Sequence, residues 1–187
     1  TFDKHIKRNF DKMVKAFQDL NPKKAKFHLS LIKARARGME AEAGKLNTMV
    51  GADAAVFASI EPVLKAYCEN IFHVGETGAG HVVKLLNNFL GQAITTASAE
   101  AFAVGAKAGI DVHQLVRVIS AGAVNSGLFQ AMAKTLDGDY TGLRFELNNA
   151  AKDLRYYVHL AENAKVPSQV GSSVHQSLMT ACALGFG

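Results

Sequence analysis

The chain has 187 residues, 49% of them hydrophobic, and a formal net charge of +5. This composition excludes a disordered protein, because it supplies enough apolar surface for the core of one ordinary domain. Its only two cysteines, Cys68 and Cys182, cannot form a disulfide framework, which indicates a reducing compartment. No uninterrupted apolar run reaches the ~18 residues that a membrane span needs, and no signal-peptide pattern opens the chain. We expect a cytoplasmic protein, with the mitochondrial matrix as the alternative.

The positive charge is concentrated near the N-terminus. Residues 1–40 contain 11 Lys and Arg against 4 Asp and Glu, whereas the rest of the chain contains 10 against 12. Such a segment either contacts nucleic acid or an acidic partner, or forms the solvated face of an amphipathic helix. We favour the helix, because apolar residues recur at helical spacing between the lysines of residues 3–20. We therefore expect no nucleic-acid partner and no membrane partner.

The first part of the chain alternates between strand and helix patterns. Three short apolar or alternating runs predict strands: residues 27–32, 45–51 and 70–74. Asp53 is a typical cap for a helix that reaches about residue 67, and Pro62 should break or kink it. Three strands amount to about half of a doubly wound sheet. Residues 1–77 should therefore form a partial Rossmann-like α/β segment with a basic N-terminal helix.

From residue 78 onward the pattern is helical throughout. One long helix is predicted from residue 79 to residue 108, with Gly109 as its C-terminal stop. Asp111 is a typical cap for the next helix. Further helices are predicted to end near residues 121 and 136 and to span residues 145–164 and 168–184. The expected fold is mainly α, with a remnant of a Rossmann-like sheet followed by an all-helical domain, residues 78–187, around one long central helix.

The long helix is apolar over most of its circumference, which indicates burial, yet it carries a polar stripe. His81, Lys84, Asn88 and Gln92 share one face. A buried lysine costs several kcal/mol unless something compensates for it. Lys84 and Asn88 lie one turn apart. They either contact the same small ligand in a wet cleft, or are a lysine reaching solvent beside a hydrogen-bonded asparagine.

Three glycines, Gly75, Gly78 and Gly80, precede this helix. A dinucleotide-binding loop needs the order Gly-x-Gly-x-x-Gly in a βαβ unit, with an acidic residue about 20 positions later. Here the order is Gly-x-x-Gly-x-Gly, and no strand is predicted after the helix. The glycines therefore favour a sharp turn and a close approach of backbone or ligand.

The segment "HVGETGAGHVVKLLNN" resembles the catalytic segment of the β-hydroxyacid dehydrogenases, a family that includes 3-hydroxyisobutyrate dehydrogenase and tartronate semialdehyde reductase. The family pattern is Gly-x-x-Gly-x-Gly, three residues, then Lys-x-x-Asn-Asn, and it is complete here. Other matching segments keep their order: "AGKLNTMVGAD", "SIEPVLKAYCENIFHVG", "AEAFAVGAKAGID" and "FELNNAAKDLRYYVHLAENAKVP". The resemblance extends over residues 38–187 and implies the C-terminal portion of such an enzyme.

The resemblance implies roles for residues of the long helix. Lys84 would exchange a proton with the substrate hydroxyl while hydride passes to or from NAD or NADP. Asn88 would hydrogen-bond the same hydroxyl, and Asn87 would help to position it. The alternative for Asn87 is an ordinary structural hydrogen bond. We assign no metal, because His73 and His81 lack the spacing of metal ligands.

The resemblance also implies roles outside that helix. Lys152 would reach the substrate and nicotinamide region with Asp153 supporting it, unless Asp153 is simply a structural hydrogen-bonding residue. Phe145 would line the pocket, unless it is a core residue. Gly78 would belong to the loop near the cofactor.

The chain also departs from the family pattern. The segment "KARARGM" stands where the family has its serine-containing substrate loop. There Gly38 is retained and Arg37 replaces the serine, so both are candidates for binding the substrate. The guanidinium of Arg37 would donate two hydrogen bonds to a carboxylate of the substrate. The Gly-x-Gly-x-x-Gly motif of the cofactor half is absent.

Two functional hypotheses follow. The first is the C-terminal portion of an NAD(P)-dependent oxidoreductase acting on a small 3-hydroxy acid. The second is a truncated, non-catalytic relative that serves oligomerisation or binding and carries a basic N-terminal arm. In either case we expect a homo-oligomer, a dimer or tetramer, because the helices carry more apolar surface than the chain can bury.

Overall fold

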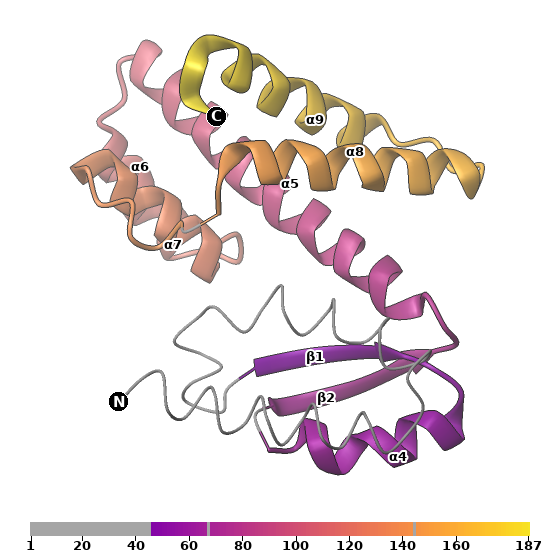
Figure 1. The fold of residues 1–187 in the computed structure, drawn as a ribbon. Helices are drawn as coiled ribbons and strands as arrows, with labels where there is room; N and C mark the ends of the chain where they lie inside the picture. Colours follow the sequence, from indigo (N-terminus) through magenta and orange to yellow (C-terminus); the bar gives the residue numbers. More distant parts are fainter. Residues whose placement is uncertain (1–45, 67, 144) are drawn as a thin grey trace. The chain divides into compact units, whose positions relative to one another are not determined.

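The computed structural model describes residues 46–66, 68–143 and 145–187 (Figure 1). The predicted N-terminal helix, the predicted strand at residues 27–32 and the candidate residues Arg37 and Gly38 lie outside the described residues. The chain divides into two compact units, one ending at Val83 and the other spanning Lys84–Gly187.

The first unit contains a two-stranded parallel sheet. Strand β1 (Leu46–Gly51) pairs with β2 (Cys68–Gly75), and helix α4 (Ala54–Leu64) connects them, as a parallel pair requires. These strands confirm the predictions for residues 45–51 and 70–74. The core of the unit is apolar: Leu46, Val50, Ala52, Ile60, Leu64 and Cys68.

Helix α4 begins as predicted but passes through its proline. The carboxylate of Asp53 accepts a hydrogen bond of 2.9 Å from the backbone N–H of Val56, which is an N-terminal cap. Of the two predicted effects of Pro62, a break or a kink, the break is wrong, because the helix continues to Leu64. Ile60 and Leu64, 6% and 3% exposed, hold this last turn on the core. Burying two such side chains, at about 1.5–3 kcal/mol each, offsets the ~3 kcal/mol cost of a helical proline.

The second unit is helical. Helix α5 (Ala79–Lys107), which starts in the first unit, runs for 29 residues without interruption and confirms the predicted long helix. Gly109 follows it with φ +79°, and Asp111 caps the next helix. The remaining elements are α6 (Val112–Ser120), α7 (Gly127–Lys134), the 3-10 turn η1 (Thr135–Asp137), α8 (Leu147–Asn163), α9 (Gln169–Ala181) and the π-helical end η2 (Cys182–Phe186).

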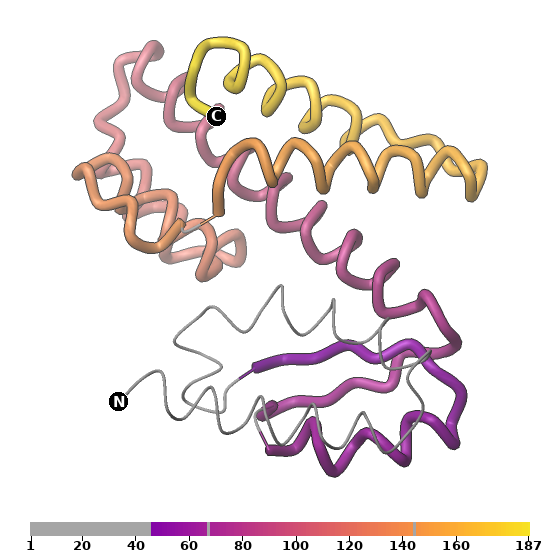
Figure 2. The backbone as a smooth tube through the Cα atoms, viewed as in Figure 1, coloured from indigo at the N-terminus to yellow at the C-terminus, as the bar shows by residue number. Residues whose placement is uncertain are grey.

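Two apolar clusters hold the helices of the second unit together. Phe102 of α5 packs with Phe129 and Ala133 of α7, and side chains of α6 cover them. Helices α8 and α9 lie side by side (Figure 2). Their shared core comprises Ala150, Ala151, Leu154, Val174 and Leu178, against which Phe89 and Ala93 of α5 pack. The fold is thus mainly α with a partial Rossmann-like part, as the sequence predicts.

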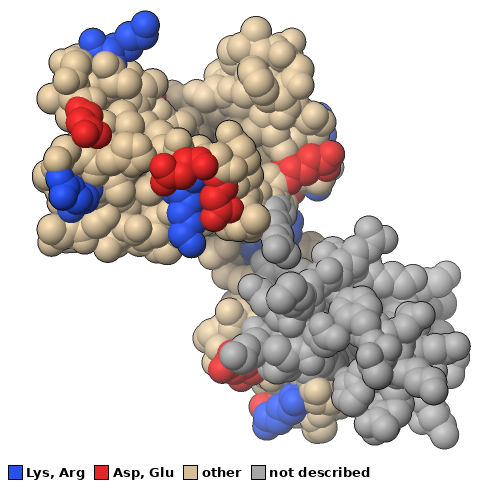
Figure 3. Space-filling model, turned by 90° about the vertical axis from the view of Figure 1, so that its left-hand side faces the viewer, with Lys and Arg blue, Asp and Glu red and all other residues tan. Residues whose placement is uncertain are grey.

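The surface of the described residues carries its charges in small groups. On the face of the molecule drawn in Figure 3, basic and acidic side chains of the helical unit lie near one another among uncharged residues. None of the helices in the described ranges is long and apolar enough to cross a membrane.

Candidate functional site

The glycine-rich turn before α5 is shaped by backbone packing. A Cβ atom on Gly80 would lie 2.7 Å from the carbonyl oxygen of Met49, and one on Gly51 would lie 2.5 Å from that of Glu76. Gly75 and Gly78 have φ values of +123° and +102°, which side-chain-bearing residues rarely adopt. The prediction of a sharp turn with close backbone approach is therefore confirmed. Backbone atoms therefore lie directly against Gly51 and Gly80, whereas nothing lies within 4 Å of a Cβ position on Gly78.

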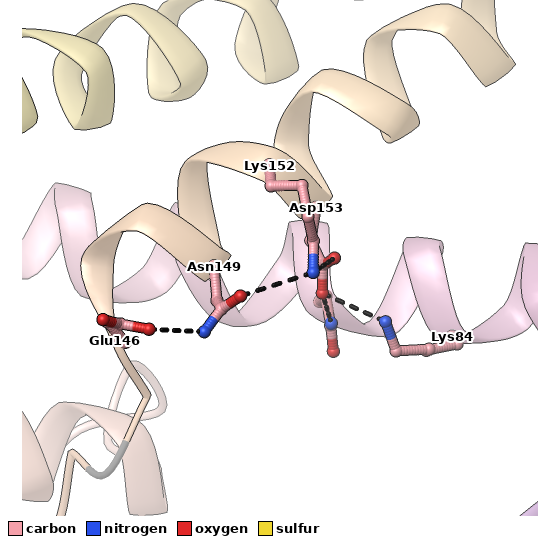
Figure 4. Close-up of polar contacts among 6 residues, drawn as sticks. Lys84, Glu146, Asn149, Lys152 and Asp153 are labelled. Carbon is pink, nitrogen blue, oxygen red and sulfur yellow. Dashed lines mark hydrogen bonds and ion pairs between the residues drawn. The ribbon is translucent and has the colours of Figure 1, made fainter. Parts of the chain in front are cut away.

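Lys84 and Asn88 of α5 share one partner on α8. The Lys84 ammonium lies 3.1 Å from Oδ2 of Asp153 (Figure 4). The amide of Asn88 donates a hydrogen bond of 2.6 Å to the same oxygen. The side chain of Asp153 is 4% exposed, whereas that of Lys84 is 35% exposed. Lys84 thus reaches solvent beside a hydrogen-bonded asparagine, as one of the two sequence alternatives has it, and the contact of both residues with a small ligand stays a prediction.

Asp153 remains ionised because its donors outweigh its burial. Burial alone raises the pKa of this carboxyl, but the hydrogen bonds from Lys84 and Asn88 and the charges of Lys84 and Lys152 hold it below its ordinary value. A buried carboxylate that lost a partner would be strongly destabilising. The arrangement therefore directs Lys84 and Asn88 toward one carboxylate oxygen.

A network of hydrogen bonds and ion pairs extends from Asp153 along the first turns of α8 (Figure 4). The Lys152 ammonium lies 3.4 Å from Oδ1 of Asp153 and donates to the amide oxygen of Asn149, also at 3.4 Å. The amide nitrogen of Asn149 donates to the carboxylate of Glu146 at 2.7 Å. We did not anticipate Glu146 or Asn149. Their spacing of three residues from each other and from Lys152 was the available signal.

The other candidates within the described residues are not members of this contact group. Phe145 is 47% exposed and precedes the first residue of α8 by two positions. Asn87 is an exposed residue of α5, and Gly78 belongs to the first unit. The roles of all three stay predictions. Across the described parts of the chain, no three His, Cys, Asp or Glu side chains are placed to hold a metal ion.

Two protein-family models match the chain. Residues 78–187 match the model described as the NAD-binding domain of NADP-dependent 3-hydroxyisobutyrate dehydrogenase. Residues 37–75 match the NAD-binding domain of 6-phosphogluconate dehydrogenase.

Similar proteins include a 2-(hydroxymethyl)glutarate dehydrogenase of Eubacterium barkeri, 34% identical over 79% of this chain and 49% of that protein. An L-threonate dehydrogenase of Cupriavidus necator is 33% identical over 79% of this chain and 50% of its own length. Among solved structures, 3-hydroxyisobutyrate dehydrogenase from Salmonella typhimurium has a TM-score of 0.70 at 31% identity, covering 79% of this chain and 52% of that one. The chain thus spans about half the length of the relatives it matches. With a family model matched over residues 78–187, more than half of its length, the chain belongs to the β-hydroxyacid dehydrogenase family.

Proposed function

We propose that the full-length protein is an NAD(P)-dependent oxidoreductase that transfers hydride between the nicotinamide and a small 3-hydroxy acid. In this proposal residues 1–77 belong to the Rossmann-like part, and residues 78–187 form the helical domain that supplies the proton-transferring group. The observation that carries the proposal is the pairing of Lys84 and Asn88 on the buried carboxylate of Asp153. The dehydrogenase names of the relatives support it.

The residues present fit the reacting end of such a cofactor. Lys84, Asn88 and Lys152 together offer two ammonium groups and an amide around one carboxylate, so this group has a net positive charge that suits an acidic substrate. Lys152 and Phe145, 44% and 47% exposed, would contact the nicotinamide end of the cofactor. Gly78, which has φ +102° and nothing within 4 Å of its Cβ position, would belong to the loop near the cofactor.

Lys84 is the group that moves the proton. When bound, the nicotinamide accepts or supplies the hydride at the substrate carbon. In the oxidative direction Nζ of Lys84 takes the hydroxyl proton, and the carboxylate of Asp153 stabilises the ammonium that forms. In the reductive direction the ammonium returns that proton to the carbonyl oxygen.

Asn88 orients the oxygen that gains or loses the proton. Its side-chain amide has two N–H groups. One donates to Asp153 at 2.6 Å, and the second is the donor for the substrate oxygen. Asp153 therefore holds the amide in one orientation and sets the direction of this second donor.

The experiment is a substrate survey with the full-length protein. Small 3-hydroxy acids are supplied with NAD⁺ or NADP⁺, and formation of the reduced cofactor is followed. We expect turnover of at least one acid. The matched neutral amide of the same alcohol should react far more slowly, because it lacks the carboxylate that the positive charge attracts. A folded protein that turns over none of the acids would refute the proposal and favour the non-catalytic binding module.

A further inference from the structure

A pair of stacked rings links α5 to α8 directly beside the polar site. Phe89 and Tyr157 lie with their ring centroids 4.1 Å apart and their planes within 4°. Phe89 follows Asn88 in α5, and Tyr157 lies one helical turn after Asp153 in α8. The ring stack and the Asn88–Asp153 hydrogen bond therefore join the same two stretches of helix.

The ring of Tyr157 also rests against the backbone of α9. Gly171 is buried there, and a Cβ atom at that position would overlap Cε1 of Tyr157 and lie 2.8 Å from Cδ1. Only a glycine leaves room for the ring in this position. Tyr157 is thus in contact with α5 through Phe89 and with α9 through Gly171, within the apolar cluster that holds α8 and α9 together.

The polar contacts at the site tolerate little movement. A donor–acceptor separation of 2.6 Å at Asn88 becomes too long for a hydrogen bond after a displacement of about 1 Å. Asp153 and Tyr157 are four residues apart, so they project from the same face of α8. If α8 slides or rotates against α5, the carboxylate of Asp153 moves with it. The ring stack limits how far α8 can move.

We propose that Tyr157, seated on Gly171 and stacked on Phe89, is a positioning residue that holds Asp153 of α8 against Lys84 and Asn88 of α5. Its consequence for catalysis rests on the proposed function. Tyr157 takes no part in the proton transfer. It fixes the distance between the carboxylate and the groups that contact the substrate, and a misplacement of about 1 Å at such a site can lower a rate by about 10²-fold.

The test uses the full-length enzyme with paired substitutions. Tyr157→Leu removes the stack, whereas the matched control Tyr157→Phe keeps the ring. We expect Tyr157→Leu to lower kcat by about 10–100-fold with a smaller change in KM, and Tyr157→Phe to stay within about threefold of the wild type. Both substitutions are repeated in an Asp153→Asn background. There the effect of Tyr157→Leu should largely disappear, because two residues that act through one carboxylate are not additive.

A second readout needs no activity. Titration of the Asp153 carboxyl, followed by carbon NMR, should show its pKa rising toward the ordinary value in Tyr157→Leu and staying low in Tyr157→Phe. An effect of Tyr157→Leu on kcat that is equally large in the Asp153→Asn background would overturn the inference, as would an unchanged titration. If the wild type turns over no hydroxy acid, the proposed function fails while the titration still decides the positioning role. If Tyr157→Leu does not fold, Phe89→Leu removes the same stack from the other helix.

Discussion

One buried carboxylate organises the polar residues of the candidate site. Asp153, 3% exposed, receives Lys84 and Asn88 on one oxygen and Lys152 on the other. Because all three contact one buried carboxylate, the three donors are coupled through it. A change at Asp153 should therefore alter both the stability of the helical unit and the reaction.

The low pKa of Asp153 makes stability depend on pH in a predictable direction. A carboxyl whose folded pKa lies below its unfolded value of ~3.9 contributes stability that is fully present above that value. The contribution is lost as pH falls through the folded pKa. The free energy of unfolding, measured with urea, should therefore fall more steeply below about pH 4 in the wild type than in Asp153→Asn. Identical pH profiles for the two proteins would contradict this account.

The sequence predicts only the local half of the site. Lys84 and Asn88 belong to one helix, so their common face follows from helical periodicity. Asp153 lies 65 positions beyond Asn88, and its contact depends on how α8 packs against α5. Ring stacking at Tyr157 and the space left by Gly171 set that packing, and neither leaves a periodic signal. The family resemblance implied that Asp153 supports Lys152. It did not imply the contacts of Asp153 with Lys84 and Asn88.

At the scale of elements, helix ends were predictable and close packing was not. Asp53, Asp111 and Gly109 act through hydrogen bonds and dihedral angles within a few residues, so their effects follow from the sequence. The helix does not break at Pro62, because neighbouring side chains are buried in the core of the first unit, and this tertiary effect is not visible in the local sequence.

The backbone contact at Gly80 gives a stability prediction. Gly80→Ala should destabilise the protein by about 1–3 kcal/mol, because its Cβ would meet the carbonyl oxygen of Met49 at 2.7 Å. Gly127→Ala is the matched control, since nothing lies within 4 Å of its Cβ position and it begins α7. That control should be neutral or stabilising by up to about 1 kcal/mol. Thermal unfolding compares the two variants. Equal unfolding temperatures would show that the close approach of Gly80 to Met49 does not affect stability.

The free energy of unfolding should fall in mild acid because of His175 of α9. Burial lowers the pKa of His175, and the charges of Arg155 and His159 lower it further. A folded histidine that resists protonation contributes stability above its ordinary pKa of ~6.5, and this contribution is lost as pH falls below that value. Between pH 7 and pH 5, the free energy of unfolding measured with a chemical denaturant should therefore fall less in His175→Gln than in the wild type. The same loss in both would contradict the prediction.

At the scale of the whole molecule, α5 carries an apolar stripe that the described residues leave exposed. Leu86, Leu90, Ile94 and Val104 are 44%, 59%, 38% and 62% exposed. Exposed apolar surface on this scale usually marks a contact with another chain. We propose that a second copy of the full-length protein covers it.

Analytical ultracentrifugation tests this self-association. The wild type should sediment as a dimer or larger at micromolar concentration, and Leu90→Glu should shift it toward the monomer. Val124→Glu, at an equally apolar but separate position that is 74% exposed, should leave the oligomer unchanged. A wild type that sediments as a monomer would rule out the self-association.

The proton-transfer role of Lys84 is tested most directly by turnover of a small 3-hydroxy acid in the full-length enzyme. Lys84→Met keeps the apolar length of the side chain and removes the proton carrier, while Asn88 and Lys152 still contact Asp153. Lys107→Met, an exposed lysine at the end of the same helix, is the matched control and should retain wild-type turnover. We predict that kcat of Lys84→Met falls by about 10²–10⁴-fold, the usual contribution of a positioned acid or base. A folded Lys84→Met enzyme with near-wild-type kcat would contradict the account.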